Sequence, residues 1–254
     1  MAFEDCARLV ERADPMRFRA AMAAPLSARR ILFALYAFNI EVSRAPWVTK
    51  EPMIAEMRLQ WWRDVLEEVR SGGPVRRHEV TDELAAVLDP EGAETLDALI
   101  AARRWDVYSD TFEDQAHFEA YIDATSGGLM WTAARLLGAE AEAPVRDIAY
   151  GSGVAGFLQA IPALEEAGRK PLIDGTPEGV RSLARSALAR LKQGRAAQKA
   201  VAAPARPALL PAHASVAVLR RAAKMPELVV KGALAPSALR DRMALARAAL
   251  TGRV

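Results

Sequence analysis

Three aspartates at helical spacing are the residues of this chain with the clearest capacity for chemistry. Asp106, Asp110 and Asp114 follow one another at four-residue intervals, which would bring their carboxylates to one face of a helix. Carboxylate oxygens are the ligands that Mg²⁺ prefers, so a metal site is one interpretation. The stretch Ser109-Asp110-Thr111 also has the character of a helix end, where these side chains would cap the backbone and face solvent.

A glycine-rich segment offers a second kind of chemistry. Gly151–Gly156 has the glycine spacing of a dinucleotide-binding loop, with Asp174 downstream of it. Such a loop works between a strand and a helix. The preceding residues, Pro144–Tyr150, have a helical pattern, so we interpret the match as coincidental.

The remaining candidates for metal or nucleophilic chemistry are isolated. His78, His117 and His213 lie far apart, and we assign none of them to a metal site. Cys6 is the only cysteine, so the chain cannot form an intramolecular disulfide or a paired-cysteine zinc site. It falls on the apolar face of a short predicted helix, and we expect an inert thiol in a reducing compartment.

Helices must position all of these residues. The 254 residues are rich in Ala, Leu and Arg and lack the alternating pattern of strands, which predicts a single all-α domain. The expected helices cover about residues 3–12, 15–24, 31–45, 51–70, 81–89, 92–109, 114–137, 144–161 and 177–203, with two more around residues 231–232. Asp14, Thr49 and Thr176 are predicted helix caps, and the proline-rich residues 202–212 are a candidate linker.

Charge is distributed unevenly along the chain. The net charge is only +2, yet residues 181–254 contain 15 Lys and Arg against two Asp and Glu. This basic, Ala-rich segment from about residue 176 is expected to meet a membrane, a protein partner or the acidic remainder of the chain. It contains no aromatic residue, which argues against nucleic acid as a partner.

The termini and hydropathy suggest a location. The acidic beginning, Met1–Cys6, lacks the basic and apolar pattern of a secretion signal. No apolar stretch has the roughly 18 residues that a spanning helix needs. We therefore expect a cytoplasmic protein or one bound peripherally at the inner membrane, where the basic helix after Thr176 would provide the contact.

Two short motifs resemble the squalene/phytoene synthase family. Tyr36-Ala37-Phe38 is similar to the start of the family's first signature helix, and Gly168-Arg169 is similar to the end of its second. The resemblance extends over most of residues 17–175. It implies the isoprenoid-synthase-like helical fold, in which two aspartate-rich motifs hold Mg²⁺ while two prenyl diphosphates are joined.

The aspartates of both motifs are missing from this chain. Aligned without gaps, the acidic positions of the first motif fall on Ser43, Arg44 and Trp47, and those of the second fall on Ala160 and Leu164. Mg²⁺ needs carboxylate oxygens to neutralise a departing diphosphate. The comparison therefore predicts a scaffold without catalytic residues, metal ligands or a cofactor.

The function expected from this pattern is assembly or interaction with other proteins. Gln159–Pro162 and Gly168–Leu172 resemble the non-catalytic branch of the family that includes a mitochondrial assembly factor of respiratory complex I, so respiratory-chain subunits are the expected partners. The alternative is an active prenyltransferase that uses Mg²⁺ with Glu41, Arg58 and the Asp106/Asp110 pair. A helical lipid-binding module is a third interpretation.

The resemblance also implies a substrate tunnel. Aromatic, small and polar residues occupy positions similar to its walls, although the same residues at helical spacing would serve equally as core. These predicted substrate-binding residues are Tyr36, Phe38, Glu41, Arg58, Trp62, Tyr121, Gly156 and Gln159.

Overall fold

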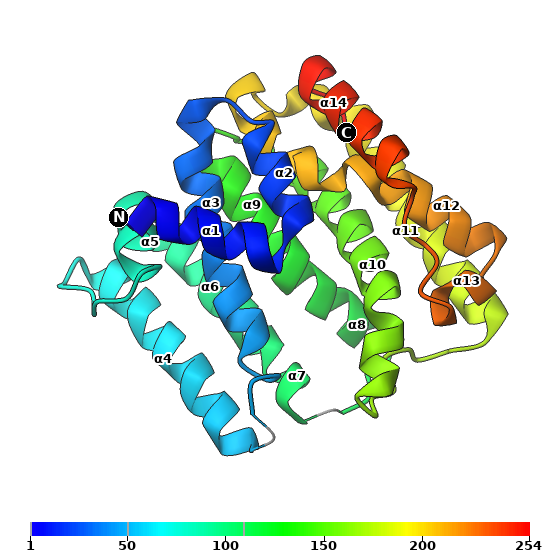
Figure 1. Ribbon diagram of the computed structural model, residues 1–254, viewed down its shortest axis with the longest axis horizontal. Helices are drawn as coiled ribbons and strands as arrows, with labels where there is room; N and C mark the ends of the chain where they lie inside the picture. Colours follow the sequence, from blue (N-terminus) through cyan, green and yellow to red (C-terminus); the bar gives the residue numbers. More distant parts are fainter. Residues whose placement is uncertain (1, 50, 109) are drawn as a thin grey trace.

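Helices and their connections form the part of the chain that this computed structural model describes, residues 2–49, 51–108 and 110–254, and no strand occurs in it (Figure 1). The elements are α1 (Ala2–Ala13), α2 (Pro15–Met22), α3 (Leu26–Arg44), α4 (Pro52–Ser71), α5 (Thr81–Val87), α6 (Pro90–Arg103), α7 (Trp105–Tyr108), α8 (Gln115–Ile122), the π-helix η1 (Asp123–Gly127), α9 (Gly128–Leu136), α10 (Glu142–Glu166), α11 (Pro177–Ala197), the 3₁₀-helices η2 (Gln198–Ala200) and η3 (Ala203–Ala214), α12 (Ser215–Lys224), α13 (Glu227–Val230) and α14 (Ala238–Thr251). The predicted all-α fold is confirmed.

Helix α3 lies in the interior of the bundle. Residues 32–40 are all buried, as the uninterrupted apolar run predicts. Helices α1, α2, α5 and α9 pack around it. The second organising helix, α10, runs down the other side of the bundle and packs against α9, α11, α12 and η3 (Figure 1).

Two of the three predicted helix caps, Asp14 and Thr176, are confirmed, and Asp89 caps α6 in the same way. The side chains of Asp14, Asp89 and Thr176 each accept a hydrogen bond from the backbone N–H three residues later, which satisfies an otherwise free donor of the first turn. Thr49 is the exception. Its hydroxyl accepts from the N–H of Glu51 at 3.1 Å, and α4 begins at Pro52, so the predicted cap at Thr49 is wrong because this hydroxyl closes a tight turn before the helix.

Two predicted long helices are interrupted. The expected helix over residues 92–109 stops at Arg103, and the short α7 follows Arg104; its predicted end at Ser109 lies outside the described residues. The expected helix over residues 114–137 consists of α8 and α9 joined by one π-helical turn. A π turn inserts an extra residue into the helical ladder, a feature that apolar periodicity does not reveal.

The candidate linker at residues 202–212 is wrong. This segment is most of η3, which packs against α9, α10 and α14, and Leu209 is fully buried. Proline lacks a backbone donor and breaks α-helices, so Pro204, Pro207 and Pro211 exclude an α-helix. They do not exclude burial, and the segment forms part of the core.

Close helix packing explains the dinucleotide-like glycines. Gly151 and Gly153 lie inside α10, with no strand before them in the described residues. A Cβ on Gly151 would come within 2.5 Å of Leu191 on α11, and one on Gly153 within 2.6 Å of Ser126 on η1. The glycines let neighbouring helices approach α10, so the match to the nucleotide-binding pattern is coincidental, as predicted.

Membrane-spanning helices are not a feature of this fold. Within residues 2–49, 51–108 and 110–254, every helix is too short or too polar to cross a bilayer.

Candidate functional site

The two motif segments meet at one end of the bundle. Helix α3 ends at Arg44, and a turn with a hydrogen bond from the N–H of Trp47 to the carbonyl of Arg44 follows. Helix α10 ends at Glu166, and Gly168 adopts a φ of +79°, which lets the next N–H return to the last helical turn. These two chain reversals bring Trp47 and Arg169 together.

Arg169 occupies the space between the two segments. Its guanidinium carbon lies 4.4 Å from the centre of the Trp47 indole ring, within the range of a cation–π interaction. Nη2 donates a hydrogen bond to the main-chain carbonyl of Asp106, while Nη1 is buried without a partner among the described residues. Arg169 is only 7% exposed, so it anchors the end of α10 to the loop after α3 and to α7.

A buried three-residue cluster adjoins Arg169. Arg103 donates to the Asp106 carboxylate at 3.0 Å and to the Tyr121 hydroxyl at 2.7 Å. The Tyr121 hydroxyl lies 3.1 Å from one Asp106 oxygen and donates to this carboxylate. Burial and the neighbouring Asp106 carboxylate raise the pKa of Tyr121. The cluster therefore holds a neutral phenol between a carboxylate and a guanidinium.

The predicted carboxylate pair of Asp106 and Asp110 does not form a metal site. Asp106 is held by Arg103 and Tyr121, and Asp110 is exposed in a loop. Asp114 caps α8 by accepting from the N–H of His117 at 2.8 Å, which agrees with the capping interpretation. Across residues 2–49, 51–108 and 110–254, His, Cys, Asp and Glu side chains form no group of three that could hold a metal ion.

Mg²⁺ does not fit the residues at the motif positions either. Ser43, Arg44, Trp47, Ala160 and Leu164 contain no carboxylate. A guanidinium at Arg44 is exposed and paired with Glu41, 3.3 Å away. This donor set supplies none of the anionic oxygens that a divalent cation requires.

The aromatic residues predicted for the tunnel are packed as core. Phe38 and Trp62 join α3 to α4 through an edge-to-face contact at 5.5 Å. Tyr36 is buried, with the Arg17 guanidinium 5.7 Å from its ring centre. Tyr121 contacts Phe157 at 6.3 Å between ring centres. These contacts link neighbouring helices and leave a substrate-binding role as a prediction.

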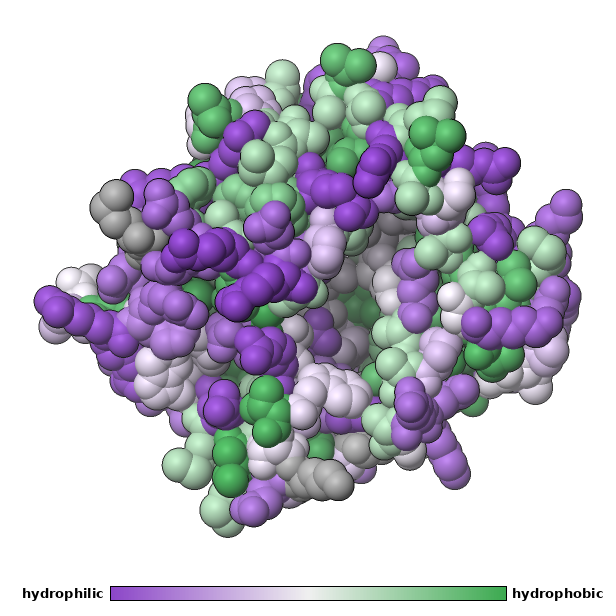
Figure 2. All heavy atoms as spheres, viewed as in Figure 1, coloured by the Kyte–Doolittle hydropathy of each residue, from purple (hydrophilic) through white to green (hydrophobic). Residues whose placement is uncertain are grey.

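The polar and small residues predicted for the tunnel are dispersed. Gly156 and Gln159 lie on one face of α10 and line a cavity of about 350 Å³, together with residues from α2, η3, α12 and the segment before α14. Figure 2 shows the surface hollowed between α2 and α10. Arg58 is exposed on α4, and Glu41 pairs with Arg44. The structure therefore does not gather all the predicted site residues in one cavity.

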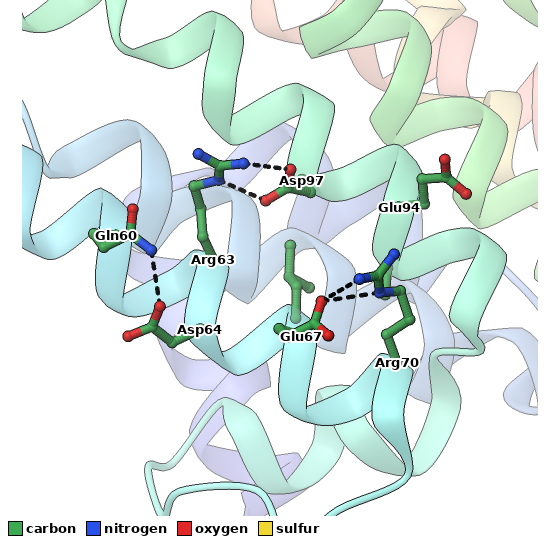
Figure 3. Close-up of a pocket in the computed structure, with 9 residues that line it drawn as sticks. Gln60, Arg63, Asp64, Glu67, Arg70, Glu94 and Asp97 are labelled. Atoms are coloured by element: carbon green, nitrogen blue, oxygen red, sulfur yellow. Dashed lines mark hydrogen bonds and ion pairs between the residues drawn. The ribbon is translucent and has the colours of Figure 1, made fainter.

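A second hollow, of about 350 Å³, lies between α4 and α6 (Figure 3). Both arginines in it are paired: Arg63 donates to Asp97 at 2.7 Å, and Arg70 lies 2.6 Å from Glu67. Because these charges are already paired at the surface, each contributes little binding capacity for a ligand. We assign no function to this groove.

Sequence reasoning missed the Trp47–Arg169 contact and the Arg103–Asp106–Tyr121 cluster. The spacing of Arg103 and Asp106 permits an ion pair within a helical turn, and that was the only local signal. Tyr121 and Arg169 join through tertiary packing, for which a single sequence gives no spacing rule.

This geometry defines a class of protein: an all-α helical bundle of the isoprenoid-synthase type. The chain belongs to the squalene/phytoene synthase family, because the family model described as squalene/phytoene synthase matches residues 10–172. A dehydrosqualene synthase crystal structure shares the fold, with a TM-score of 0.80 and 15% identity over 98% of this chain and 95% of that one.

Curated proteins similar to this chain are named as assembly factors of NADH dehydrogenase (ubiquinone) complex I. The chain is 29% identical over 167 residues to the Drosophila melanogaster homolog of NADH dehydrogenase (ubiquinone) complex I assembly factor 6, covering 62% of this chain and 50% of that protein. It is 23% identical over 172 residues to the Homo sapiens assembly factor 6, covering 62% and 48%. The chain thus spans about half the length of these curated relatives.

Proposed function

We propose that this protein is a non-catalytic assembly factor for a respiratory NADH dehydrogenase complex. The observation that carries this proposal is the contact between Trp47 and Arg169, with the indole and the guanidinium 4.4 Å apart where the two motif segments meet. A tryptophan stands where the family's first motif would have an acidic residue. Side chains of this chain, rather than metal ligands, therefore join the two segments.

Similarity to the complex I assembly factors supports the partner class. Their names refer to the assembly of NADH dehydrogenase (ubiquinone) complex I. The partners proposed for this chain are accordingly subunits of such a complex, bound while the complex is incomplete. Assembly requires recognition of a partner surface and no bond-making step, so a scaffold without a metal clamp is sufficient for it.

A peripheral position at the inner membrane, on its cytoplasmic side, is part of the proposal. Helix α11 buries its apolar residues Val180, Ala187 and Leu191 and packs on α10 and α12, so it cannot insert an apolar face into a bilayer as a free amphipathic helix would. Its contact with the membrane would instead be electrostatic, between anionic lipid headgroups and exposed cations of α11 such as Arg185 and Lys192.

The catalytic alternative is tested by measuring pyrophosphate release. The purified protein is incubated with Mg²⁺ and farnesyl or geranylgeranyl diphosphate, with an active dehydrosqualene synthase as the positive control. We expect no release above the protein-free background. Turnover that disappears in the Glu41→Gln variant would overturn the non-catalytic proposal.

The assembly role is tested in cells that lack this chain. We expect less fully assembled NADH dehydrogenase on native gels and lower NADH oxidation by membranes, with both restored by the wild-type protein. Glu41→Gln and Arg58→Gln should restore both as well as wild type, since these residues matter only in the catalytic alternative. Unchanged complex levels without the chain would refute the proposed function.

A further inference from the structure

The C-terminal half of the chain contains a hollow whose walls are cationic. It has a volume of about 850 Å³ and lies where the end of α11, η2 and η3 meet the end of α14. The cations that line this hollow, called the basic hollow below, are Lys192, Arg195, Lys199, Arg206 and Arg253.

The cations of the basic hollow lack acidic side-chain partners among the described residues. No carboxylate of the described residues lies within 4.0 Å of the five cations. Among the 15 Lys and Arg of residues 181–254, only Arg181 and Arg190 form ion pairs with acidic residues of the described part of the chain, Glu178 and Asp147. Of the three partners considered for the basic segment, the acidic remainder of the chain is therefore excluded for these five residues.

Helix dipoles account for only part of this clustering. The C-terminal ends of α11 and α14 both reach the basic hollow, and cations are favourable there. Each helix end corresponds to roughly half a negative charge, so two ends offset about one of the five positive charges. Burial, followed by repulsion from Arg247 and Arg220, lowers the pKa of Arg195, as expected where positive charge is left in excess.

Hydrogen bonds fix the walls of the basic hollow. The buried Gln198 donates from Nε2 to the carbonyl of Gly252 at 2.7 Å, which ties η2 to the chain after α14. Arg206 donates from Nε to the carbonyl of Val201 at 3.0 Å. This bond uses only Nε, so the terminal guanidinium nitrogens of Arg206 remain available to a ligand. The two hydrogen bonds order the walls of the basic hollow before any ligand arrives.

We propose that the basic hollow binds an anion that carries two or more phosphate groups. Guanidinium groups bind phosphate oxygens through paired charge-assisted hydrogen bonds, and lysine adds a point charge. The five cations line a hollow of about 850 Å³, and their total positive charge is larger than the negative charge of one phosphate group. The anion is either a soluble polyphosphate compound or the phosphate-bearing headgroup of a lipid. This proposal does not depend on the proposed assembly role.

The soluble form is tested by calorimetric titration of the full chain with tripolyphosphate. We expect binding that weakens as salt is raised. Arg195→Gln combined with Lys199→Gln should weaken it at least about tenfold. The matched control combines Lys224→Gln with Arg240→Gln, which removes the same charge from exposed positions outside the basic hollow and should change the affinity less than twofold.

The lipid form is tested by sedimentation with vesicles of phosphatidylcholine, with and without cardiolipin. Binding that requires cardiolipin and is lost in the Arg195/Lys199 variant, without tripolyphosphate binding, assigns the site to a lipid headgroup. Binding of tripolyphosphate assigns it to a soluble anion. The proposal is overturned if neither tripolyphosphate nor cardiolipin binds, or if the Arg195/Lys199 variant and its control lose binding affinity equally.

Thermal unfolding of the same proteins separates binding from folding. Replacing Arg195 relieves repulsion, so the Arg195/Lys199 variant should melt no lower than its control in the absence of ligand. Tripolyphosphate or cardiolipin should raise the melting temperature of the wild type only. A variant that melts well below the control would show that the cations serve the fold instead of a ligand.

Discussion

The Arg169 guanidinium lies 4.4 Å from the centre of the Trp47 ring and joins two segments that are more than a hundred residues apart in sequence. The resemblance in sequence predicts that these two segments correspond to the family's aspartate-rich motifs. Here one aromatic ring and one cation connect them directly. The contact thus ties the loop after α3 to the end of α10.

The energy of this contact can be measured with a double-mutant cycle. Trp47→Leu and Arg169→Met, singly and combined, are unfolded with urea, and the coupling should be about 0.5–2 kcal/mol. Combining Trp47→Leu with Lys170→Met is the control, because Lys170 is exposed beside Arg169 and makes no such contact. A coupling near zero for the Trp47–Arg169 pair would mean that the two side chains do not stabilise each other.

Two glycines of α10 should respond oppositely to alanine. A Cβ at Gly151 would come within 2.5 Å of Leu191, whereas one at Gly156 has no atom within 4 Å. We expect Gly151→Ala to lower the free energy of unfolding by about 1–3 kcal/mol through overpacking. Gly156→Ala should leave it unchanged or raise it by up to about 1 kcal/mol, because alanine favours helix. Equal effects in chemical denaturation would contradict the close packing of α10 and α11.

The Cys6 thiol should be inert in the folded protein. Burial, with the nearby carboxylate of Glu83, raises the pKa of Cys6 to about 12, so almost no thiolate is present near neutral pH. A thiol-specific disulfide reagent should label Cys6 only after the chain is unfolded in urea. Rapid labelling of the native protein at pH 8 would refute this expectation.

The raised pKa of Cys6 also predicts that the folded protein becomes less stable at alkaline pH. Between pH 9, the ordinary value for this thiol, and pH 12, the unfolded chain loses the Cys6 proton while the folded chain keeps it. The free energy of unfolding therefore falls as pH rises through this window, by at most about 1.4 kcal/mol per pH unit from this group. Cys6→Ala should show a shallower decline than wild type in urea titrations, and identical slopes would exclude a contribution from Cys6.

The proline-rich segment should behave as core in mutagenesis. Leu209 is fully buried in η3, and Leu250 is 87% exposed on α14. Leu209→Ala should cost about 2–5 kcal/mol of stability, because it leaves a cavity. Leu250→Ala makes the same chemical change at the surface and should stay within about 0.5 kcal/mol of wild type. If the two variants lose the same free energy of unfolding, residues 202–212 do not form part of the core and the linker interpretation is correct.

The sequence by itself determined the local features of this protein. Asp14 and Thr176 mark helix starts because a cap involves only the next three residues. The burial of α3 follows from an apolar run within one helix. The absence of carboxylates at Ser43, Arg44 and Trp47 is likewise a property of the chain. Each conclusion depends on neighbouring residues, so no knowledge of the fold was needed.

Only the tertiary structure decided which distant residues meet. Arg169 reaches Trp47 and Asp106 because α10 ends beside the loop after α3, a placement that depends on the packing of the whole bundle. The burial of the prolines in η3 depends on α9, α10 and α14 closing around them. The unpaired cations of the basic hollow follow from the same packing, because net charge along a chain does not specify which charges come within contact distance.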